Sequence, residues 1–215
     1  MSAPKVKICG LSQLDDVAAV NACAPDYVGL VFWPRSKRCV SADEAACLRA
    51  ALDAHIAAVG VFVNADINAI ARLHERGVIA VAQLHGDEDD AYIERLRTRA
   101  PDLAVWKAFE VHARATVERA NASAADLVLL DAGKGEGRAF DWSVLAACRR
   151  PFALAGGLGP SNVAAALRQC SPSVVDVSSG VEGAAHATDG RPRKDAALMS
   201  AFARAVRAAG DSSTA

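Results

Sequence analysis

The sequence predicts a single-domain α/β protein with the architecture of a (β/α)8 TIM barrel. Short, Val-rich apolar runs alternate with Ala-, Leu- and Arg-rich stretches of helical period from end to end of the 215 residues. Eight such pairs occupy about 27 residues each, which is near the minimum size of this barrel. Since no shift in composition marks a domain boundary, we expect one domain over residues 1–215, ending in a short flexible tail.

The predicted strands are apolar runs whose side chains alternate between two faces. In the first run, Val6 and Ile8 fall on one face, while Lys5, Lys7 and Cys9 fall on the other. One face is therefore apolar, and the other carries groups that can do chemistry. In chain order, the predicted strands are Val6–Cys9, Tyr27–Phe32, Ala57–Val63, Val81–His85, Leu103–Phe109, Leu127–Asp131, Phe152–Ala155 and Val174–Ser178.

A predicted helix follows each strand, and three of the helices have recognisable start signals. Ser12 precedes the first, Ser41 precedes the second, and Pro160 with Ser161 opens the seventh. A doubly wound open sheet is the alternative fold, but it needs a Gly-rich turn where the chain reads CGLSQL. In chain order, the predicted helices are Leu14–Ala22, Ala42–Leu52, Ile67–Arg76, Asp89–Thr98, Ala113–Ala120, Trp142–Ala147, Pro160–Gln169 and Asp195–Ala208.

Composition and charge limit the partners of the chain. Charged residues make up 23% of the sequence and the net charge is −1, without the basic bias that binding of nucleic acid requires. No apolar run approaches the roughly 20 residues that cross a bilayer, and the N-terminus lacks the apolar core of a signal peptide. We therefore expect a cytoplasmic protein that binds neither nucleic acid nor membrane.

The six cysteines and five histidines are dispersed along the chain. No cysteines stand in a C-x-x-C arrangement, and no histidines have H-x-x-x-H or H-E-x-x-H spacing. In the absence of a secretory signal, a disulfide framework is not needed. We therefore expect no metal site and no disulfide.

The active site of such a barrel lies at the C-terminal ends of its strands. Polar and glycine residues at the predicted strand ends are therefore the candidates for binding and chemistry. They are Cys9, Gln83, His85, Lys107, Asp131, Gly156, Gly157, Asp176, Ser178, Ser179 and Gly180.

Two of these strand ends have the composition of a phosphate-binding site. Gly156 and Gly157 in LAGGLGPSNV, and Ser178, Ser179 and Gly180 in VDVSSGVE, expose backbone N–H groups to an anion. Either turn alone could be only a tight turn. Both together, after the seventh and eighth strands where barrels commonly bind phosphate, favour a phosphate cradle.

Asp131 ends the run DLVLLD, in which Leu127, Leu129 and Asp131 fall on one face. A carboxyl at the edge of an apolar wall tends to stay protonated, as a general acid must be. Alternatively, Asp131 caps the following loop, AGKGEGRAFDW, through local hydrogen bonds. The residues alone leave both possibilities open.

Cys9 is open to two interpretations as well. Free cysteine is among the most buried residue types, so Cys9 could be a small core residue. Lys7, on the same face of the strand, could instead favour a thiolate. A thiolate that faces a protonated Asp131 across the barrel would supply a base and an acid to one substrate.

The other polar groups at the rim are less specific. His85 and Lys107 could each be a hydrogen-bonded structural group or a ligand contact. The loop FWPRSKRCV carries Arg35, Lys37 and Arg38 after the second strand. Most such clusters are solvated, but an arginine at the mouth of the barrel could clamp a carboxylate bidentately.

Taken together, these segments resemble the phosphoribosylanthranilate isomerase family of tryptophan biosynthesis. The motifs KVKICG, YVGLVFWPRSKRCVS, VGVFVN, VAQLHGDE, GEGRAFDW, AGGLGPSNV, VDVSSGVE and KDAALMSAF follow in order over nearly the whole chain. The resemblance implies a TIM barrel that works without a cofactor. It also implies the Amadori rearrangement of N-(5-phosphoribosyl)anthranilate to 1-(o-carboxyphenylamino)-1-deoxyribulose 5-phosphate.

The resemblance also implies roles for individual residues. Cys9 is expected to be the general base and Asp131 the general acid. Arg38 is expected near the anthranilate carboxylate and Asp176 beside the reacting sugar. The expected partner is a phosphosugar substrate, bound by a monomer or homodimer. The expected substrate-binding residues are Arg38, His85, Gly156, Gly157, Asp176, Ser178, Ser179 and Gly180.

Two stretches depart from the family pattern. Lys134 and Glu136 stand where family members usually have consecutive glycines, and GAAHATDGRPRK is longer than the usual link to the final helix. A catalytically dead barrel that only binds a sugar phosphate is the rival from another class, but it would lack the acid or the base. A pentose-phosphate epimerase would need metal ligands, and an indole-glycerol-phosphate synthase would need catalytic lysines and a longer N-terminal extension.

Overall fold

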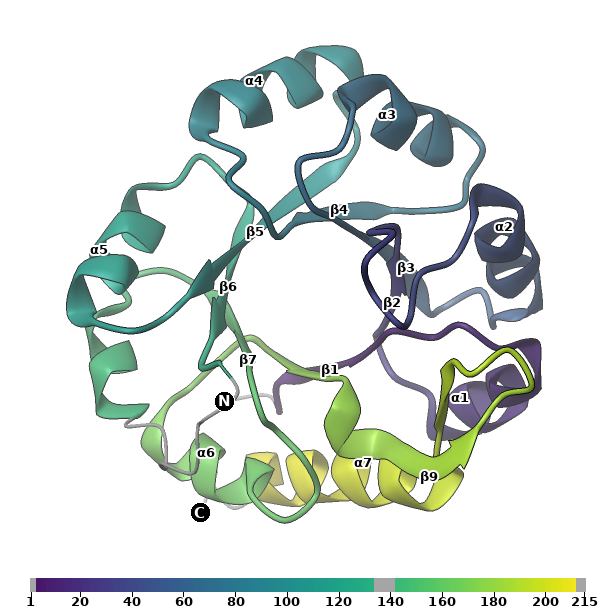
Figure 1. The fold of residues 1–215 in the computed structure, drawn as a ribbon. Helices are drawn as coiled ribbons and strands as arrows, with labels where there is room; N and C mark the ends of the chain where they lie inside the picture. The colour runs from purple at the N-terminus through teal and green to yellow at the C-terminus, as the bar shows by residue number, and fades with distance from the viewer. Residues whose placement is uncertain (1–2, 134–141, 212–215) are drawn as a thin grey trace.

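The computed structural model describes residues 3–133 and 142–211. Its eight parallel strands form a closed barrel in the order β1 to β8, surrounded by helices, which confirms the predicted TIM barrel (Figure 1). Each strand pairs with the next along the chain, and β1 closes the ring against β8. The strands are β1 (Lys5–Cys9), β2 (Tyr27–Val31), β3 (Ala57–Phe62), β4 (Val81–Leu84), β5 (Ala104–Glu110), β6 (Leu127–Asp131), β7 (Phe152–Ala155) and β8 (Val174–Val177).

The helices begin where the sequence supplies acceptors for free backbone N–H groups. Ser41 and Glu44 form a reciprocal capping box at the second helix, and Asp66 and Asp89 accept from the first turns of the next two. The α-helices are α1 (Val17–Cys23), α2 (Ala42–Ala51), α3 (Ile67–Glu75), α4 (Asp90–Arg99), α5 (Arg114–Ala122), α6 (Val163–Gln169) and α7 (Ala196–Asp211), and the 3-10 helices are η1 (Leu14–Asp16), η2 (Trp142–Ala147) and η3 (Ser179–Val181).

Two predicted start signals are wrong. Ser12 does not cap the first helix, because a 3-10 turn, η1, comes first and its N-cap position is Gln13. At α6, the seventh of the predicted helices, Asn162 rather than Pro160 or Ser161 takes the N-cap position. The Asn162 side chain accepts from Gly159 N–H at 2.8 Å and donates to Gly157 O at 2.9 Å, which closes the Gly-rich turn before the helix can begin.

Two predicted helices also differ in type or length. The segment Trp142–Ala147 is a 3-10 helix, a form that short connecting pieces commonly take. The last helix runs on to Asp211, so residues 208–211 are helical rather than part of a frayed tail. The departures at Lys134 and Glu136 lie outside the described residues.

The barrel has two apolar layers on opposite faces of its strands. Val6 and Ile8 pack outward against the helices in the larger core, as their alternation predicts. Inside the barrel, a second cluster is built around Val59, Trp106 and Leu129. Lys7 is fully buried on the interior side, so the polar face of β1 points into the barrel.

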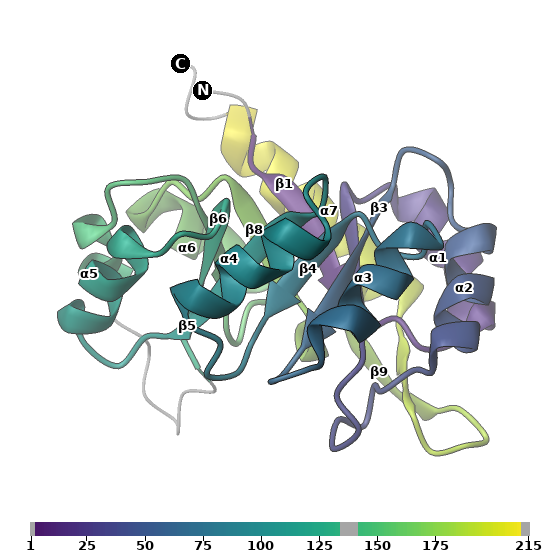
Figure 2. The ribbon, with the colours of Figure 1, turned by 90° about the horizontal axis from the view of Figure 1, so that it is seen from above.

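The long stretch after η3 folds into a two-stranded antiparallel hairpin that the sequence did not predict. It consists of β9 (Glu182–His186) and β10 (Pro192–Lys194), and Gly190, at φ +79°, lies in its turn. In Figure 2 the hairpin extends beyond the lower face of the barrel, as does the loop between β2 and α2. This face holds the C-terminal ends of the barrel strands.

The two ends of the described chain meet on the opposite face (Figure 2). A Cβ atom on Gly210, in α7, would lie 2.4 Å from Cβ of Ala3, so these residues are in direct contact. None of the described helices is long and apolar enough to cross a membrane.

Candidate active site

A cavity of about 530 Å³ lies at the C-terminal ends of the barrel strands. It collects nearly all of the site residues that the sequence predicts, with an apolar wall from Trp33, Val61 and Leu129. A hollow of about 690 Å³ at the other end of the barrel, around Tyr27 and Trp106, lacks these polar strand ends. The predicted residues that line the 530 Å³ cavity are Cys9, Arg38, Gln83, His85, Asp131, Gly156, Gly157, Asp176, Ser178 and Ser179.

Cys9 is half-buried at the end of β1, and its thiol packs against the backbone of β2. A Cβ atom on Gly29 would lie 2.6 Å from Cys9 Sγ, so the glycine makes room for the thiol. Gly10 follows with φ +81°, a conformation that glycine adopts easily, and turns the chain away from the strand. The thiol is thereby held at the edge of the cavity.

Burial and the charge of Lys7 shift the pKa of the Cys9 thiol in opposite directions. Burial raises the pKa of the Cys9 thiol, and the Lys7 ammonium lowers it. The net direction is upward, so the predicted effect of Lys7 in favour of a thiolate is present but outweighed. For Lys7, burial has the opposite effect and lowers the pKa. The charges of Asp176 and Cys9 outweigh burial, so the pKa of Lys7 is raised.

Asp131, at the end of β6, uses its two oxygens differently. Oδ1 accepts from Gly133 N–H at 2.8 Å, which caps the start of the following loop. Oδ2 lies 3.8 Å from His85 Nε2. The capping interpretation therefore holds for one oxygen, while the other is turned toward a second residue that lines the cavity. The two interpretations of Asp131 are compatible.

The Gly-rich turn after β7 and the Ser-Ser-Gly turn after β8 pack directly on each other. A Cβ atom on Gly180 would lie 2.0 Å from Leu158 O, so only glycine fits at this contact. Gly156 and Gly157 have φ values of +93° and +60°. Within the described residues, no hydrogen-bond acceptor is found for the N–H groups of Gly157, Ser179 and Gly180. They are available to an anion, and the phosphate cradle stays a prediction.

Arg38 already has a carboxylate partner within the chain. Its Nε and Nη2 donate to Glu182 Oε1 and Oε2 at 2.5 and 2.8 Å. Arg35 and Lys37 are exposed, so Arg38 is the cation of this loop that faces the cavity. The predicted bidentate clamp is thus present, but it holds Glu182.

The remaining polar groups separate into structural and cavity-facing ones. Lys107 Nζ donates to Gly86 O at 2.6 Å and to Glu88 Oε2 at 3.0 Å, which supports its structural interpretation. Asp176 Oδ2 accepts from Lys7. Within the described part of the chain, Asp176 Oδ1 and Gln83 Oε1 are buried without a hydrogen-bond partner, and both residues line the cavity. Such oxygens can accept hydrogen bonds from a ligand.

Among the side chains that the structure describes, no three His, Cys, Asp or Glu come together as metal ligands would. The sequence-based expectation that the reaction needs no metal stays a prediction.

A family model described as "N-(5'phosphoribosyl)anthranilate (PRA) isomerase" matches residues 6–205. The chain belongs to this family. Among phosphoribosylanthranilate isomerases, that of Endomicrobium trichonymphae is 44% identical over 184 residues, which are 83% of this chain and 90% of the relative. That of Granulibacter bethesdensis is 41% identical over 213 residues, which are 94% of this chain and 98% of the relative.

Solved phosphoribosylanthranilate isomerases have the same fold. The enzyme of Thermotoga maritima superposes with a TM-score of 0.83 at 33% identity, over 95% of this chain and 99% of that one. A second structure, with a TM-score of 0.80 at 33% identity over the same shares, is a complex with reduced 1-(o-carboxyphenylamino)-1-deoxyribulose 5-phosphate. Another T. maritima structure is described as monomers generated from a dimeric enzyme. The predicted family and fold are confirmed.

Sequence reasoning missed two residues beside the site. Glu182 is the partner of Arg38, and Lys194 donates to Glu182 Oε1 at 3.0 Å. Their only sequence signal is a charge at each end of the longer stretch after VDVSSG. That signal does not say which side chain they meet, because Glu182 lies 144 residues from Arg38 in the sequence.

Proposed function

We propose that Cys9 is the general base and Asp131 the general acid in the isomerisation of N-(5'-phosphoribosyl)anthranilate, the reaction for which the family is named. The observation that carries this proposal is that both residues line one cavity. They lie at the ends of β1 and β6, and only β7 and β8 separate them on the near side of the ring. Those two strands carry the phosphate cradle between the acid and the base.

As far as the enolamine, the reaction needs one proton delivered and one removed. Asp131, in its protonated form, gives a proton to the furanose ring oxygen, and the ring opens to an iminium ion. The Cys9 thiolate then removes the proton from sugar C2, which gives an enolamine. Protonation of C1 and loss of the proton from the C2 hydroxyl convert the enolamine to the ketone. Cys9 returns the proton taken from C2 to C1, and the proton lost from the C2 hydroxyl replaces the one that Asp131 gave up, so both groups end in their starting forms.

The charges and the free polar groups of the cavity suggest how the substrate lies. The phosphate is placed over Gly157, Ser179 and Gly180, whose N–H groups are available. The anthranilate carboxylate is placed beside Arg38. Asp176 Oδ1, buried and without a partner among the described residues, is placed to accept from a sugar hydroxyl.

The substrate-binding set is completed by three residues. His85 lies on the Asp131 side of the cavity, while Gly156 and Ser178 shape the two turns of the cradle. We propose that the enzyme takes a phosphosugar carrying an aromatic amine, needs no metal or cofactor, and works in the cytoplasm as a monomer or a homodimer.

Two substitutions test the acid and base roles. General acid–base catalysis usually contributes about 10²–10⁴-fold, so Cys9→Ala and Asp131→Asn should each lower kcat by at least about 100-fold. KM should change less, because the phosphate cradle is intact. The assay follows the loss of substrate fluorescence, and Cys47→Ala, at an exposed cysteine, is the control. Near-normal kcat in Cys9→Ala would mean that the thiol only packs, and the base would then be sought among His85, Lys107 and Asp176.

A further inference from the structure

We propose that Glu182 is a positioning residue for Arg38, and that it turns the free edge of the guanidinium toward the carboxylate of the substrate. The proposal rests on the role proposed for Arg38. It adds that the hairpin β9–β10, through Glu182, makes Arg38 selective for a substrate that carries a carboxylate.

The contact between Glu182 and Arg38 leaves part of the guanidinium free. A guanidinium has N–H groups along two usable edges, and a carboxylate can occupy either edge with two hydrogen bonds. Glu182 occupies the edge formed by Nε and Nη2. The edge formed by Nη1 and the second N–H of Nη2 can still receive another carboxylate. Because the group is planar, fixing one edge also fixes the direction of the other.

The stem of Arg38 is fixed as well. A Cβ atom on Gly10 would lie 2.3 Å from Arg38 Cδ, so the stem passes over the residue that follows Cys9. At the base of the loop, Val40 N–H donates to Val31 O at 2.9 Å. Arg38 is therefore held close to the catalytic end of β1 before any substrate binds.

Glu182 is itself held by Lys194. Lys194 Nζ donates to Glu182 Oε1 and to Ser178 O, both at 3.0 Å, and its side chain is 1% exposed. Ser178 belongs to the turn after β8 that we place in the phosphate cradle. The carboxylate end and the phosphate end of the site therefore share one framework, with Lys194 between them.

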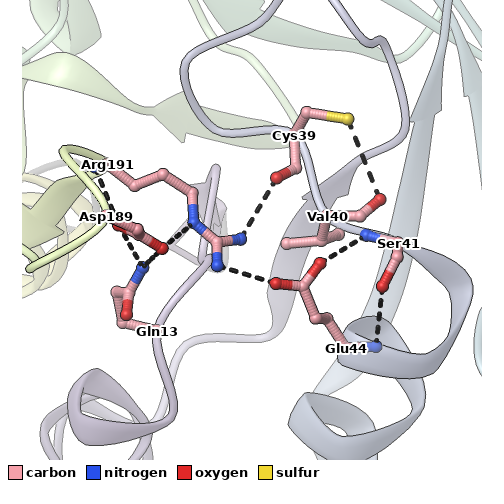
Figure 3. A network of polar contacts seen from close by, with 7 residues as sticks. All are labelled: Gln13, Cys39, Val40, Ser41, Glu44, Asp189 and Arg191. Carbon is pink, nitrogen blue, oxygen red and sulfur yellow. Dashed lines mark hydrogen bonds and ion pairs between the residues drawn. The ribbon is translucent and has the colours of Figure 1, made fainter.

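The tip of the hairpin is tied to the segment that follows Arg38 (Figure 3). Arg191 donates to Cys39 O at 3.2 Å, to Glu44 Oε1 at 2.7 Å and to Asp189 Oδ2 at 2.5 Å. Cys39 is the next residue after Arg38, and Glu44 belongs to the first turn of α2. The hairpin that carries Glu182 and the loop that carries Arg38 are thus joined at a second place.

A second ion pair fixes the base of the hairpin. Arg193 Nη2 lies 2.7 Å from Asp16 Oδ1, and Lys194 N–H donates to Asp16 Oδ2 at 2.9 Å. Since Asp16 is buried, this end of the hairpin is anchored against η1, the 3-10 helix after β1. The backbone around Glu182 should therefore stay in place when its side chain is changed.

The experiment compares two substrates that differ only in the carboxylate. These are phosphoribosylanthranilate and phosphoribosylaniline, the latter prepared by condensing ribose 5-phosphate with aniline. In Glu182→Gln, kcat/KM should fall about tenfold or more for the first substrate, through KM, and less than about threefold for the second. Glu182→Asp, which keeps the charge, should recover part of the loss. Glu75→Gln, in an exposed ion pair between α3 and α4, is the matched control.

The outcomes separate this inference from the role proposed for Arg38. If Arg38→Ala loses its preference for the carboxylate substrate and Glu182→Gln does not, the positioning role is wrong and the role of Arg38 stands. If neither variant loses the preference, the role proposed for Arg38 is wrong, and so is the inference about Glu182. An equal loss on both substrates in Glu182→Gln would also overturn the inference, since Glu182 would then only stabilise the fold. If Glu182→Gln does not fold, Glu182→Gln/Lys194→Met, which removes both charges of the ion pair, replaces it.

Discussion

The Lys7 ammonium donates to Asp176 Oδ2 at 2.8 Å inside the barrel, where the two side chains are 0% and 7% exposed. The pair joins β1 to β8 directly, because Lys7 and Asp176 are register partners on these strands. It compensates a charge that burial would otherwise disfavour. It also places a fixed positive charge two residues before Cys9 and leaves Asp176 Oδ1 without a partner among the described residues.

Removing the Lys7 charge should move the pH dependence of activity. Because Lys7 lowers the pKa of the Cys9 thiol against the effect of burial, Lys7→Met should raise that pKa further. If Cys9 is the base, the rising limb of kcat/KM against pH then moves to higher pH. Lys5→Met, at an exposed lysine of the same strand, is the control. An unmoved limb would mean that a group other than Cys9 sets it.

The variant Lys7→Met should also be less stable. Breaking a buried ion pair by removing one partner typically lowers the free energy of unfolding by about 3–5 kcal/mol. The pH profile is therefore measured at a temperature at which circular dichroism confirms that the variant is folded. Comparing urea unfolding with Lys5→Met separates this loss from any effect of a surface charge.

Arg38→Ala should lose the interaction with the carboxylate of phosphoribosylanthranilate. The loss of a charge-assisted hydrogen bond is about 1.5–3 kcal/mol, which corresponds to roughly 10- to 150-fold in kcat/KM. Arg35→Ala, at an exposed arginine of the same loop, should behave like the unchanged enzyme. The opposite result, a crippled Arg35→Ala beside a normal Arg38→Ala, would mean that Arg35 and not Arg38 binds the carboxylate.

The Glu182 ion pairs should stabilise the fold in a pH-dependent way. Burial raises the pKa of Glu182, but Arg38 and Lys194 outweigh it and hold the pKa below its ordinary value of 4.5. A carboxyl with a lowered folded-state pKa contributes stability above its unfolded pKa, and this stability is lost as the pH falls through the folded pKa. The difference in free energy of unfolding between wild type and Glu182→Gln should thus be largest near neutral pH and shrink below pH 4.5.

Denaturant unfolding at a series of pH values measures this difference. Glu75→Gln removes an exposed ion pair and should show little difference at any pH. A gap between wild type and Glu182→Gln that stays constant into the acid range would show that the carboxyl contributes through packing rather than through its charge.

Chelation should leave the activity intact. An acid and a base from side chains suffice for the proposed mechanism, and neither step uses a metal. The enzyme is dialysed against EDTA and assayed by the loss of substrate fluorescence. Loss of activity that zinc or manganese restores would overturn the mechanism and favour the epimerase alternative.

Much of the site could be predicted because a residue that ends a strand in the sequence also lies at the mouth of the barrel. Cys9, Asp131 and Asp176 each lie at or near the end of an apolar strand, and the closed parallel sheet brings these ends to one rim. Alternation gave the face of each side chain, since neighbours on a strand point to opposite sides. Local pattern is sufficient for both inferences.

The features that sequence could not give depend on contacts made across the fold. Arg38 looked free to clamp a ligand because Glu182, its partner, is distant in the sequence. The helix start at Asn162 was missed because its side chain closes the preceding turn instead of the helix. The raised pKa of Cys9 results from burial. The sequence shows only the lysine two residues away, whose charge acts in the opposite direction.

The contact between Ala3 and Gly210 makes the chain almost a closed loop on the side away from the cavity. A short linker joining the two ends would therefore leave the strand pairings undisturbed, and new ends could be opened elsewhere. Gly77, between α3 and β4, suits such an opening, because no atom lies within 4 Å of where its Cβ would be. A circular permutant that begins at Val78 would run from β8 through the hairpin, α7 and the linker directly into β1, so the two strands that close the barrel would become consecutive strands in the sequence.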